Sequence, residues 1–442
     1  MTRPPGDQRS RWRPRPGLRL PRHRATNAHM SAIYPFHGGN GLGPKGVYIG
    51  EDQSAGGTAW HYDPFQLYTD GIITSPNMLV LGMVGSGKSA AVKTLLYRSV
   101  GLLGSADGQP RWCAILDPKG EYGPLAKALG LARIRLAPGG TTRLNPLDAG
   151  PVSVGVDGLR SRRAQMIAAL SASVLGRELT PLEDAAIGWI TDELNRSGEH
   201  EPTLADVVHL LASPTAAMRD RAQFDRAERL AQELNGLRFG IGKLLDGSLR
   251  GMFDGQSTER IDWTGRGVVI DLSAVHQDTA ALTAVMIAAT GWLQSLLAAP
   301  ESEHVPRRVQ VLEEIWALLG SERVAKYYQS CQKLARSYGV ANISVAHRIA
   351  DLRAQTNDGT AAAKVSMGIL ADTQTQILFR QSADQIPEAV QNLGLTTHEA
   401  AILPRLARGQ ALWKVADHTA IVQHRIGTNE WSICDTDRRL SV

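Results

Sequence analysis

A glycine-rich segment in the first quarter of the chain has the residue types and the spacing that bind phosphate. Its residues fit the pattern G-x-x-x-x-G-K-[ST], with an apolar, strand-like run before it and an apolar-periodic, helix-like run after it. Backbone N–H groups of such a loop surround phosphate oxygens, and the following helix directs the positive end of its dipole at them. We therefore predict a site for a nucleoside triphosphate, with Lys88 on the β and γ phosphates and the Ser89 hydroxyl on Mg²⁺. The predicted binding residues are Gly82, Met83, Val84, Gly85, Ser86, Gly87, Lys88, Ser89 and Ala90.

Two adjacent acidic residues supply what a nucleotide-hydrolysing site needs besides this loop. The apolar run Val309–Leu312 is predicted to be a strand, and Glu313 and Glu314 follow it directly. In a P-loop enzyme, one carboxylate holds the magnesium shell and another polarises the attacking water. We assign Glu313, together with Ser89, to the metal and Glu314 to the general base. The alternative is the start of a helix, where the dipole favours acidic side chains.

A second polar cluster follows an earlier apolar run, in the segment CAILDPKGEY. Asp117 is predicted to lie at the carboxyl end of a strand, where parallel sheets bind ligands, with Lys119 and Glu121 close by. The alternative is a turn with a helix cap, because D-P-K-G is favourable turn chemistry. The sequence leaves both interpretations open.

The net charge of +5 is unevenly distributed along the 442 residues. Residues 1–29 contain eight arginines and one acidic residue, which is +7 and leaves −2 for the rest of the chain. Residues 1–35 are predicted to be a disordered tail rich in arginine and proline, and they lack the apolar segment of a secretory signal or membrane anchor. Two interpretations stay open: a nucleic-acid-binding arm, or sequence upstream of a true start at Met30.

Cysteine spacing and hydropathy argue against a protein held by disulfides or cysteine-bound metal and against a membrane-spanning protein. The three cysteines are widely separated and lack any C-x-x-C or paired-histidine spacing, so neither a disulfide framework nor a cysteine metal site is expected. The uncharged run Thr279–Ala299 is long enough to cross a bilayer. Its polar residues, and its place between two predicted core strands, favour a helix buried against a sheet.

Short apolar runs alternate with helical patterns, which predicts an α/β fold with a mainly parallel sheet covered by helices. From about residue 155 to 256 only helical patterns occur, and they start at the capping patterns Thr180–Glu183 and Thr203–Asp206. We predict a first part of the core at 36–154, an all-helical insertion at 155–256, and a second part at 257–442 ending in a hairpin that turns near Asp417. The predicted strands besides the one before the glycine-rich loop are Cys113–Leu116, Ile134–Leu136, Val268–Leu272, Val309–Leu312, Ile343–Ala346 and Ile377–Phe379.

With these motifs in order, the chain resembles the CagE/TrbE/VirB family of conjugation and type IV secretion ATPases, within the HerA/FtsK group. The resemblance runs from about Gly43 to Asp437 and includes the helical insertion. It implies a RecA-like P-loop NTPase fold, ATP and Mg²⁺ as ligands, and a homohexamer at the cytoplasmic inner face of the cell membrane, on a membrane-embedded secretion or conjugation complex. The shared motifs are DPKGEY at 117–122, RLNPLD at 143–148, LEEIW at 312–316, AHRIADL at 346–352, ILFRQ at 377–381 and EWSICDTD at 430–437.

The resemblance also implies roles for two further residues. His347 stands at the position of the family's sensor glutamine, and Arg336 lies 22 residues after Glu314 and 11 before His347, a spacing like that of an arginine finger. Lys333, Arg348 and Arg380 are rivals for that role, and the alternative for Arg336 is a solvated helix surface.

Three departures from the family leave its function open. Glutamate replaces the usual aspartate at position 313, histidine replaces glutamine at 347, and the family's large amino-terminal domain is missing. The leading hypothesis is a hexameric ATPase that powers conjugative transfer or secretion. A DNA-translocating coupling protein, acting on single- or double-stranded DNA, and a nucleotide-dependent assembly scaffold with little turnover are the alternatives. A small-molecule kinase is the least favoured hypothesis, because no phosphoacceptor pocket or lid is recognisable.

Overall fold

The structure is a computed structural model of the chain. The predicted tail at 1–35 and the motif residues 349–352 and 436–437 lie outside the part of the chain that it describes. The described residues are 41–103, 110–149, 156–197, 201–247, 249–259, 265–297, 306–319, 321–348, 364–365, 368–369 and 373–435.

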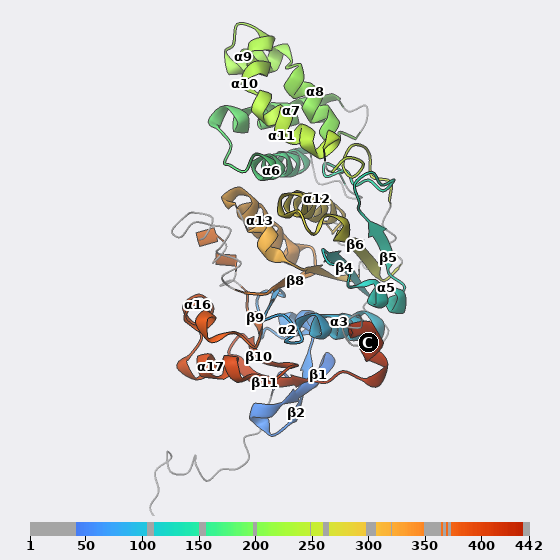
Figure 1. Ribbon diagram of the computed structural model, residues 1–442, viewed down its shortest axis with the longest axis vertical. Coiled ribbons are helices and arrows are strands. Elements are labelled where there is room, and N and C mark those ends of the chain that lie inside the picture. Colours follow the sequence, from blue (N-terminus) through green and yellow to red (C-terminus); the bar gives the residue numbers. More distant parts are fainter. Residues whose placement is uncertain are drawn as a thin grey trace, which may run out of the picture.

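One large sheet runs through the described part of the chain (Figure 1). Seven strands are parallel, in the order β9-β3-β8-β7-β4-β6-β5. The predicted α/β fold with a mainly parallel sheet is confirmed, and every predicted strand overlaps an observed one. These strands are β3 (Met78–Leu81), β4 (Arg111–Asp117), β5 (Ala132–Arg135), β6 (Gly267–Asp271), β7 (Arg307–Leu312), β8 (Val340–Ala346) and β9 (Thr375–Phe379).

Four antiparallel strands extend the sheet beyond β9. The predicted hairpin is present as β10 (Gln410–Val415) and β11 (His418–His424), and β1 (Val47–Asp52) and β2 (Thr58–Tyr62) complete the edge. Strand β2 was not among the strands predicted from the sequence. The buried aromatic rings of β2 pack edge-on against Trp413 of β10, so its stability depends on a strand 350 residues away.

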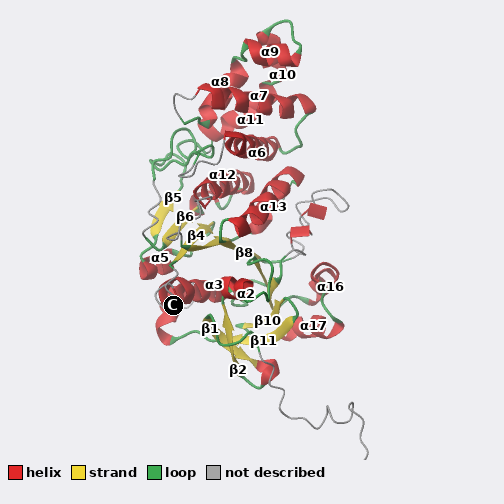
Figure 2. Cartoon of the chain, turned by 180° about the vertical axis from the view of Figure 1, so that it is seen from behind, coloured by secondary structure: helices red, strands yellow, loops and turns green. Residues whose placement is uncertain are grey.

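Successive residues of the parallel strands face two different helical layers, as the strand period of two requires. On β3, Met78 and Val80 pack in a core with α3 (Lys88–Arg98) and α5 (Gly123–Leu129), whereas Leu79 and Leu81 pack in the other core. Helices α12 (Thr279–Leu297) and α13 (Glu322–Ser337) cover the second face (Figure 2). The remaining helices of this part are α2 (Pro64–Thr69), α16 (Ile386–Leu393), α17 (Thr397–Ile402) and α18 (Trp431–Cys434).

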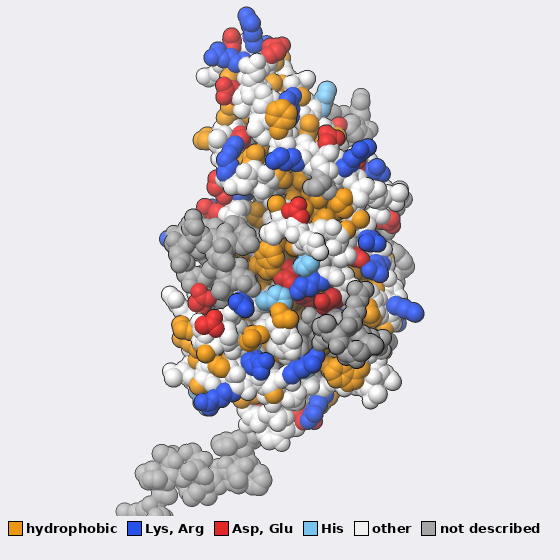
Figure 3. All heavy atoms as spheres, viewed as in Figure 1, with side chains coloured by type: hydrophobic (Ala, Val, Ile, Leu, Met, Phe, Trp, Pro, Cys, Tyr) orange, Lys and Arg blue, Asp and Glu red, His pale blue; other side chains and the backbone are white. Residues whose placement is uncertain are grey.

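The uncharged run that could have been a membrane span is α12. Its described side chains are mostly buried, and Leu282, Val285 and Ile287 are fully inaccessible. Among the described helices, none is both long and apolar enough to cross a bilayer. On the face of the molecule shown in Figure 3, acidic and basic side chains are interspersed and do not gather into one basic stripe.

Six consecutive helices follow β5 in the described residues between 156 and 247, and they project from the sheet at one end (Figure 1). Both predicted capping patterns form: Glu183 N–H donates to Thr180 Oγ1 over 3.3 Å, and Thr203 N–H donates to Asp206 Oδ2 over 2.8 Å. The insertion boundaries at 155 and 256 stay a prediction. The helices are α6 (Val156–Leu175), α7 (Pro181–Ser197), α8 (Leu204–Ala212), α9 (Ala216–Ala222), α10 (Ala227–Glu233) and α11 (Asn235–Asp246).

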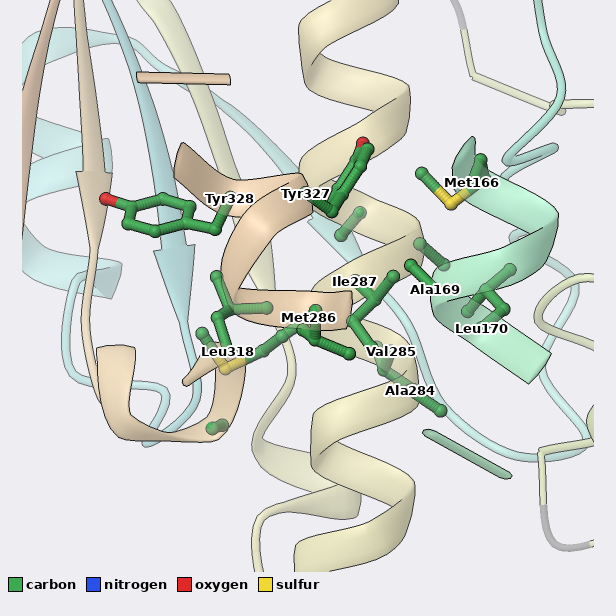
Figure 4. Packing of buried hydrophobic residues seen from close by; sticks show 14 of the residues in the cluster. Met166, Ala169, Leu170, Ala284, Val285, Met286, Ile287, Leu318, Tyr327 and Tyr328 are labelled. Atoms are coloured by element: carbon green, nitrogen blue, oxygen red, sulfur yellow. The ribbon is translucent and has the colours of Figure 1, made fainter. Parts of the chain in front are cut away.

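Helix α6 joins these helices to the rest of the fold through an apolar contact. Met166 and Leu170 lie toward α12 and toward Tyr327 of α13 (Figure 4). A Cβ on Gly291 of α12 would meet the Met166 side chain, so the two helices approach closely there. The RLNPLD segment reinforces the joint, because the Asn145 side-chain amide donates to Pro202 O over 2.9 Å and its carbonyl accepts from Leu147 N.

A buried ion pair fixes the start of α2 to β4. The two terminal nitrogens of Arg111 donate to the two carboxylate oxygens of Asp63 over 3.0 and 2.8 Å, and the side chains are 1% and 5% exposed. We expect Asp63→Asn to lower the free energy of unfolding by about 3 kcal/mol or more, because it leaves a buried guanidinium without its counter-charge.

The measurement is urea denaturation of the full chain. Asp70→Asn is the matched control: Asp70 also pairs with a cation, Lys45, but that lysine is 60% exposed, so a loss below about 1 kcal/mol is expected. An equal loss in the free energy of unfolding for the two variants would show that the buried ion pair contributes no more to stability than the exposed one.

Candidate functional site

The glycine-rich loop connects β3 to α3 with a backbone that other residues could not adopt. Gly85 and Gly87 have φ of 75° and 112°, in the left-handed region that favours glycine. A Cβ on Gly82 would lie 2.4 Å from the Cβ of Phe379 on β9, so a side chain there would collide with the neighbouring strand. The loop therefore keeps an open turn ahead of the α3 N-terminus, as phosphate binding requires.

Lys88 is folded back onto this loop. Its Nζ donates to Gly82 O and to Met83 O, the latter over 3.0 Å, and lies 3.1 Å from His347 Nδ1. The Lys88 ammonium group therefore lies beside the loop that is predicted to bind phosphate. Phosphate oxygens could accept the hydrogen bonds that the two loop carbonyls accept in this structure.

A cavity of about 430 Å³ lies in front of the loop. Gly85, Gly87, Lys88 and Ser89 line one side, and Lys119, Glu121 and His347 line another. Sequence analysis placed all these residues near the carboxyl ends of strands, and the structure brings them to one hollow.

The two adjacent glutamates have different surroundings. Glu313 accepts a hydrogen bond from the Tyr122 hydroxyl. Glu314 is buried, and its Oε1 lies 3.0 Å from His347 Nε2 and forms an ion pair with Lys119, while its Oε2 accepts from Trp316 Nε1. Glu314 also has φ of 55°, a left-handed conformation uncommon for a residue with a side chain. Strained backbone of this kind concentrates at functional sites.

These contacts set the charge of each carboxylate. Burial raises the pKa of Glu313 above its usual value, against the hydrogen bond from Tyr122. Burial acts in the same direction on Glu314, but hydrogen bonds from His347 and Lys119 outweigh it and hold the pKa of Glu314 well below the ordinary range. Glu314 is therefore ionised at neutral pH.

Asp117 acts as a cap in this structure. Its two carboxylate oxygens accept from the backbone N–H groups of Glu121 and Tyr122 over 3.0 and 2.9 Å. This favours the turn interpretation of the DPKGEY segment, and the same turn places Lys119 and Glu121 on the cavity wall.

The donor set suits magnesium bound mainly through a nucleotide. Among the described residues, no three His, Cys, Asp or Glu side chains form a ready metal site. Magnesium seldom needs such a cage, because one or two carboxylates, water and substrate phosphates complete its octahedron. Ser89 on the cavity wall and the Glu313 carboxylate after β7 are ligands of the right kind.

With the geometry in place, comparison with known proteins identifies the family. The family model described as Helicase HerA, central domain (DUF87), matches residues 64–290, just over half of the chain. The chain belongs to this HerA family. The predicted membership of the HerA/FtsK group is confirmed. No sequence among the curated proteins matches the chain.

Solved structures share the fold of this HerA-family chain. VirB4 of Thermoanaerobacter pseudethanolicus aligns with a TM-score of 0.67 and 18% identity over 88% of this chain and 99% of that one. The unbound bacterial conjugative coupling protein TrwBΔN70 aligns with a TM-score of 0.54 and 16% identity over 80% and 85%. TrwB in complex with ADP and Mg²⁺ aligns with 0.53 and 16% over 80% and 86%. At these identities the likeness establishes the fold.

Sequence analysis missed the last wall of the HerA-family cavity. Arg408, Gly409, His424, Arg425 and Trp431 line it, so the hairpin and α18 close the hollow from the carboxyl-terminal side. Gly409 N–H donates to Ser86 O over 2.9 Å, which ties the hairpin to the glycine-rich loop. The predicted hairpin and the EWSICDTD motif were the signals in this region, and the sequence did not indicate what either of them contacts.

Arg336 lies in α13, but its side chain is outside the described part, so its predicted role stays a prediction. Its rivals Lys333, Arg348 and Arg380 are exposed. Exposure suits a residue that reaches a neighbouring subunit, and it equally suits a solvated surface.

A half-buried histidine at the cavity wall predicts a pH dependence of stability. His424 Nδ1 lies 3.0 Å from Gly409 O, Trp413 Nε1 donates to its Nε2 over 3.3 Å, and burial lowers its pKa to about 4. Because histidine in an unfolded chain titrates near 6.5, protons bind the unfolded state preferentially as the pH falls from about 6.5 towards 4.

We therefore expect the free energy of unfolding to fall by about 2 kcal/mol more between pH 7 and pH 5 in the wild type than in His424→Gln. Urea denaturation at both pH values gives the comparison. His418→Gln, at an exposed position of the same strand, should keep the wild-type difference. An unchanged pH dependence in His424→Gln would contradict a His424 that stays neutral in the folded protein.

Proposed function

We propose that this HerA-family chain hydrolyses ATP and works as the motor of a conjugation or type IV secretion complex. The observation that carries the proposal is that Lys88 and His347 line one cavity beside the glycine-rich loop, with Glu314 directly behind His347 at 3.0 Å from its Nε2. The TrwB structures in complex with ADPNP and with ADP and Mg²⁺ support these ligands for this fold.

Each residue has a distinct task in the proposed reaction. Backbone N–H groups from Gly85 to Ala90 hold the phosphates, and Lys88 exchanges the carbonyls of the loop for the β and γ oxygens. Ser89 and Glu313 would hold Mg²⁺, which neutralises charge developing between the β and γ phosphates. Glu314 orients the attacking water and takes its proton. His347 lies at hydrogen-bonding distance from both Lys88 and Glu314. A shift of His347 on binding of the γ-phosphate would therefore change the contacts of both residues.

The assembly belongs to the same proposal. A homohexamer places an arginine of one subunit at the nucleotide of the next, and we assign Arg336 to that position. We place the hexamer in the cytoplasm, peripherally at the inner face of the cell membrane, on the membrane-embedded complex. The likeness to VirB4 and to the coupling protein TrwB supports this setting through the shared fold. The face shown in Figure 3 carries interspersed charges and no basic stripe, so this face does not favour DNA over protein as the transported substrate.

The proposed domain plan follows the sequence: a tail at 1–35, core segments at 36–154 and 257–442, and the helical insertion at 155–256. The close contact of α6 with α12 and α13 supports an insertion that moves with the core (Figure 4).

A nucleotide-dependent scaffold with little turnover is the competing function, because Glu313 and His347 differ from the usual residues. Turnover measured as phosphate release separates the two. We expect hydrolysis by the wild type, and a loss of about 10² to 10³ in kcat for Lys88→Ala, which removes charge stabilisation at the γ-phosphate. Glu314→Gln should bind ATP and hydrolyse it very slowly, because the amide keeps the size and loses the base.

Lys127→Ala, on the exposed side of α5, is the control and should keep wild-type turnover. Normal turnover in Lys88→Ala would remove the P-loop assignment. Wild-type protein that binds ATP and assembles with no turnover would favour the scaffold. Identical behaviour of Glu313→Gln and Glu314→Gln would contradict the division between metal and water.

The role of Arg336 is tested by mixing two inactive proteins. Arg336→Ala should bind ATP and lose turnover, because an arginine finger contributes roughly 10³ to 10⁵ in rate. Mixed with Glu314→Gln, it should regain activity, because some interfaces then pair an intact base with an intact arginine. Lys333→Ala should keep turnover. A mixture that never exceeds the sum of its components, at any ratio, would exclude action of Arg336 between subunits.

A further inference from the structure

We propose that Lys119 is a phosphate-sensing residue: it holds Glu314 while the γ-phosphate position is empty and leaves it for the γ-phosphate of a bound triphosphate. The inference rests on the proposed function, because it concerns the same cavity. It gives Lys119 a part, beside Lys88 and His347, in distinguishing nucleoside triphosphate from diphosphate.

The backbone around Lys119 is fixed, so that only its side chain needs to move. The Asp117 carboxylate accepts from two N–H groups on the far side of the turn, and Gly120 has φ of 71°. A Cβ on Gly120 would lie 3.2 Å from the Ser273 side chain, so the turn also packs tightly on the segment after β6. The Lys119 side chain is 33% exposed and extends along the cavity wall.

Lys119 and Lys88 lie on opposite sides of one imidazole. Lys119 Nζ is 3.0 Å from His347 Nε2, and Lys88 Nζ is 3.1 Å from His347 Nδ1. Lys88 is the residue predicted to bind the β and γ phosphates. The Lys119 ammonium group is therefore separated from that of Lys88 by one ring and two contacts of hydrogen-bond length, and the flexible four-carbon stem of a lysine can cover such a distance without backbone movement.

The present contacts of Lys119 restrain the predicted general base. Glu314 Oε1 faces Lys119 and His347, and Oε2 accepts from Trp316. A carboxylate has about four lone-pair positions, two on each oxygen, so Lys119 and His347 occupy both positions of Oε1 and Trp316 occupies one of Oε2. Loss of Lys119 frees a position on Oε1 for a water molecule.

Electrostatics favour the transfer only when a γ-phosphate is present. A terminal phosphate carries more negative charge than one carboxylate and offers three acceptor oxygens, so it competes for the ammonium group. A diphosphate does not extend to that position. Glu314 does not lose all support when Lys119 moves, because His347 and Trp316 remain as partners. The exchange therefore couples release of the base to triphosphate binding.

A double-mutant cycle of binding tests this exchange with the full chain and Mg²⁺. The probes are ADPNP, a non-hydrolysable triphosphate, and ADP, and the variants are Lys119→Met, Glu314→Gln and their combination. We expect Lys119→Met to weaken ADPNP binding by at least about threefold and to change ADP binding by less than about twofold, because only the triphosphate contacts this ammonium group.

The decisive comparison is the effect of Glu314→Gln in the two backgrounds. If Lys119 must leave Glu314, the substitution tightens ADPNP binding more when Lys119 is present than in the Lys119→Met background. If Glu314 only repels the γ-phosphate, the tightening is equal or larger in the Lys119→Met background, since no cation then screens the repulsion. That second result, or an unchanged ratio of ADPNP to ADP affinity in Lys119→Met, would overturn the proposal.

Two controls separate this role from loss of structure. Lys127→Met removes an exposed lysine of the same region and should leave both affinities unchanged. Lys119→Arg keeps the charge and should retain part of the preference for ADPNP. Equal weakening of ADP and ADPNP binding in Lys119→Met would indicate a structural role and contradict the inference. Because the readout is binding alone, failure of the wild type to hydrolyse ATP would count against the proposed function and not against this exchange.

Discussion

The order of four neighbouring strands is the constraint on which the candidate site depends. These strands are neighbours in the sheet in the order β3-β8-β7-β4. Parallel pairing aligns their carboxyl ends, with Leu81 beside Ala346 and Leu312 beside Leu116. The residues that follow these ends are the glycine-rich loop, His347, the two glutamates and the Lys119 turn. Groups separated by more than 250 residues thereby reach hydrogen-bonding distance, as between Lys88 and His347.

The two helical layers cover both faces of the sheet behind this edge. One layer places α3 so that its N-terminus faces the cavity, and the other layer carries α12, α13 and the helices beyond them. Against this frame, Lys88 donates to His347 Nδ1, and His347 Nε2 and Lys119 donate to Glu314. Polar groups that are buried without hydrogen-bond partners cost free energy, and these contacts give each side chain a partner. In a nucleotide complex, phosphate oxygens would be the partners of the cationic side chains.

Local patterns predicted those parts of the structure that local interactions determine. The glycine-rich loop, the two capping patterns and the short strands each depend on neighbours in sequence, and all were recognisable. Strand β2 was missed because its partner rings include Trp413 of β10, and the roles of Arg408 and Trp431 at the cavity were missed because the hairpin reaches the loop only through the folded sheet. The DPKGEY segment was ambiguous for a related reason: Asp117 caps a turn, while the pairing of Lys119 with Glu314 joins β4 to β7.

The central claim is that this edge of the sheet binds and activates a nucleoside triphosphate. A crystal structure of the chain with ADPNP and Mg²⁺ tests it most directly. The account predicts phosphates within hydrogen-bonding distance of the backbone N–H groups from Gly85 to Ala90, with Lys88 moved from Gly82 O and Met83 O onto the β and γ oxygens. A nucleotide bound elsewhere, or phosphates in this loop with Lys88 still on its carbonyls, would contradict it.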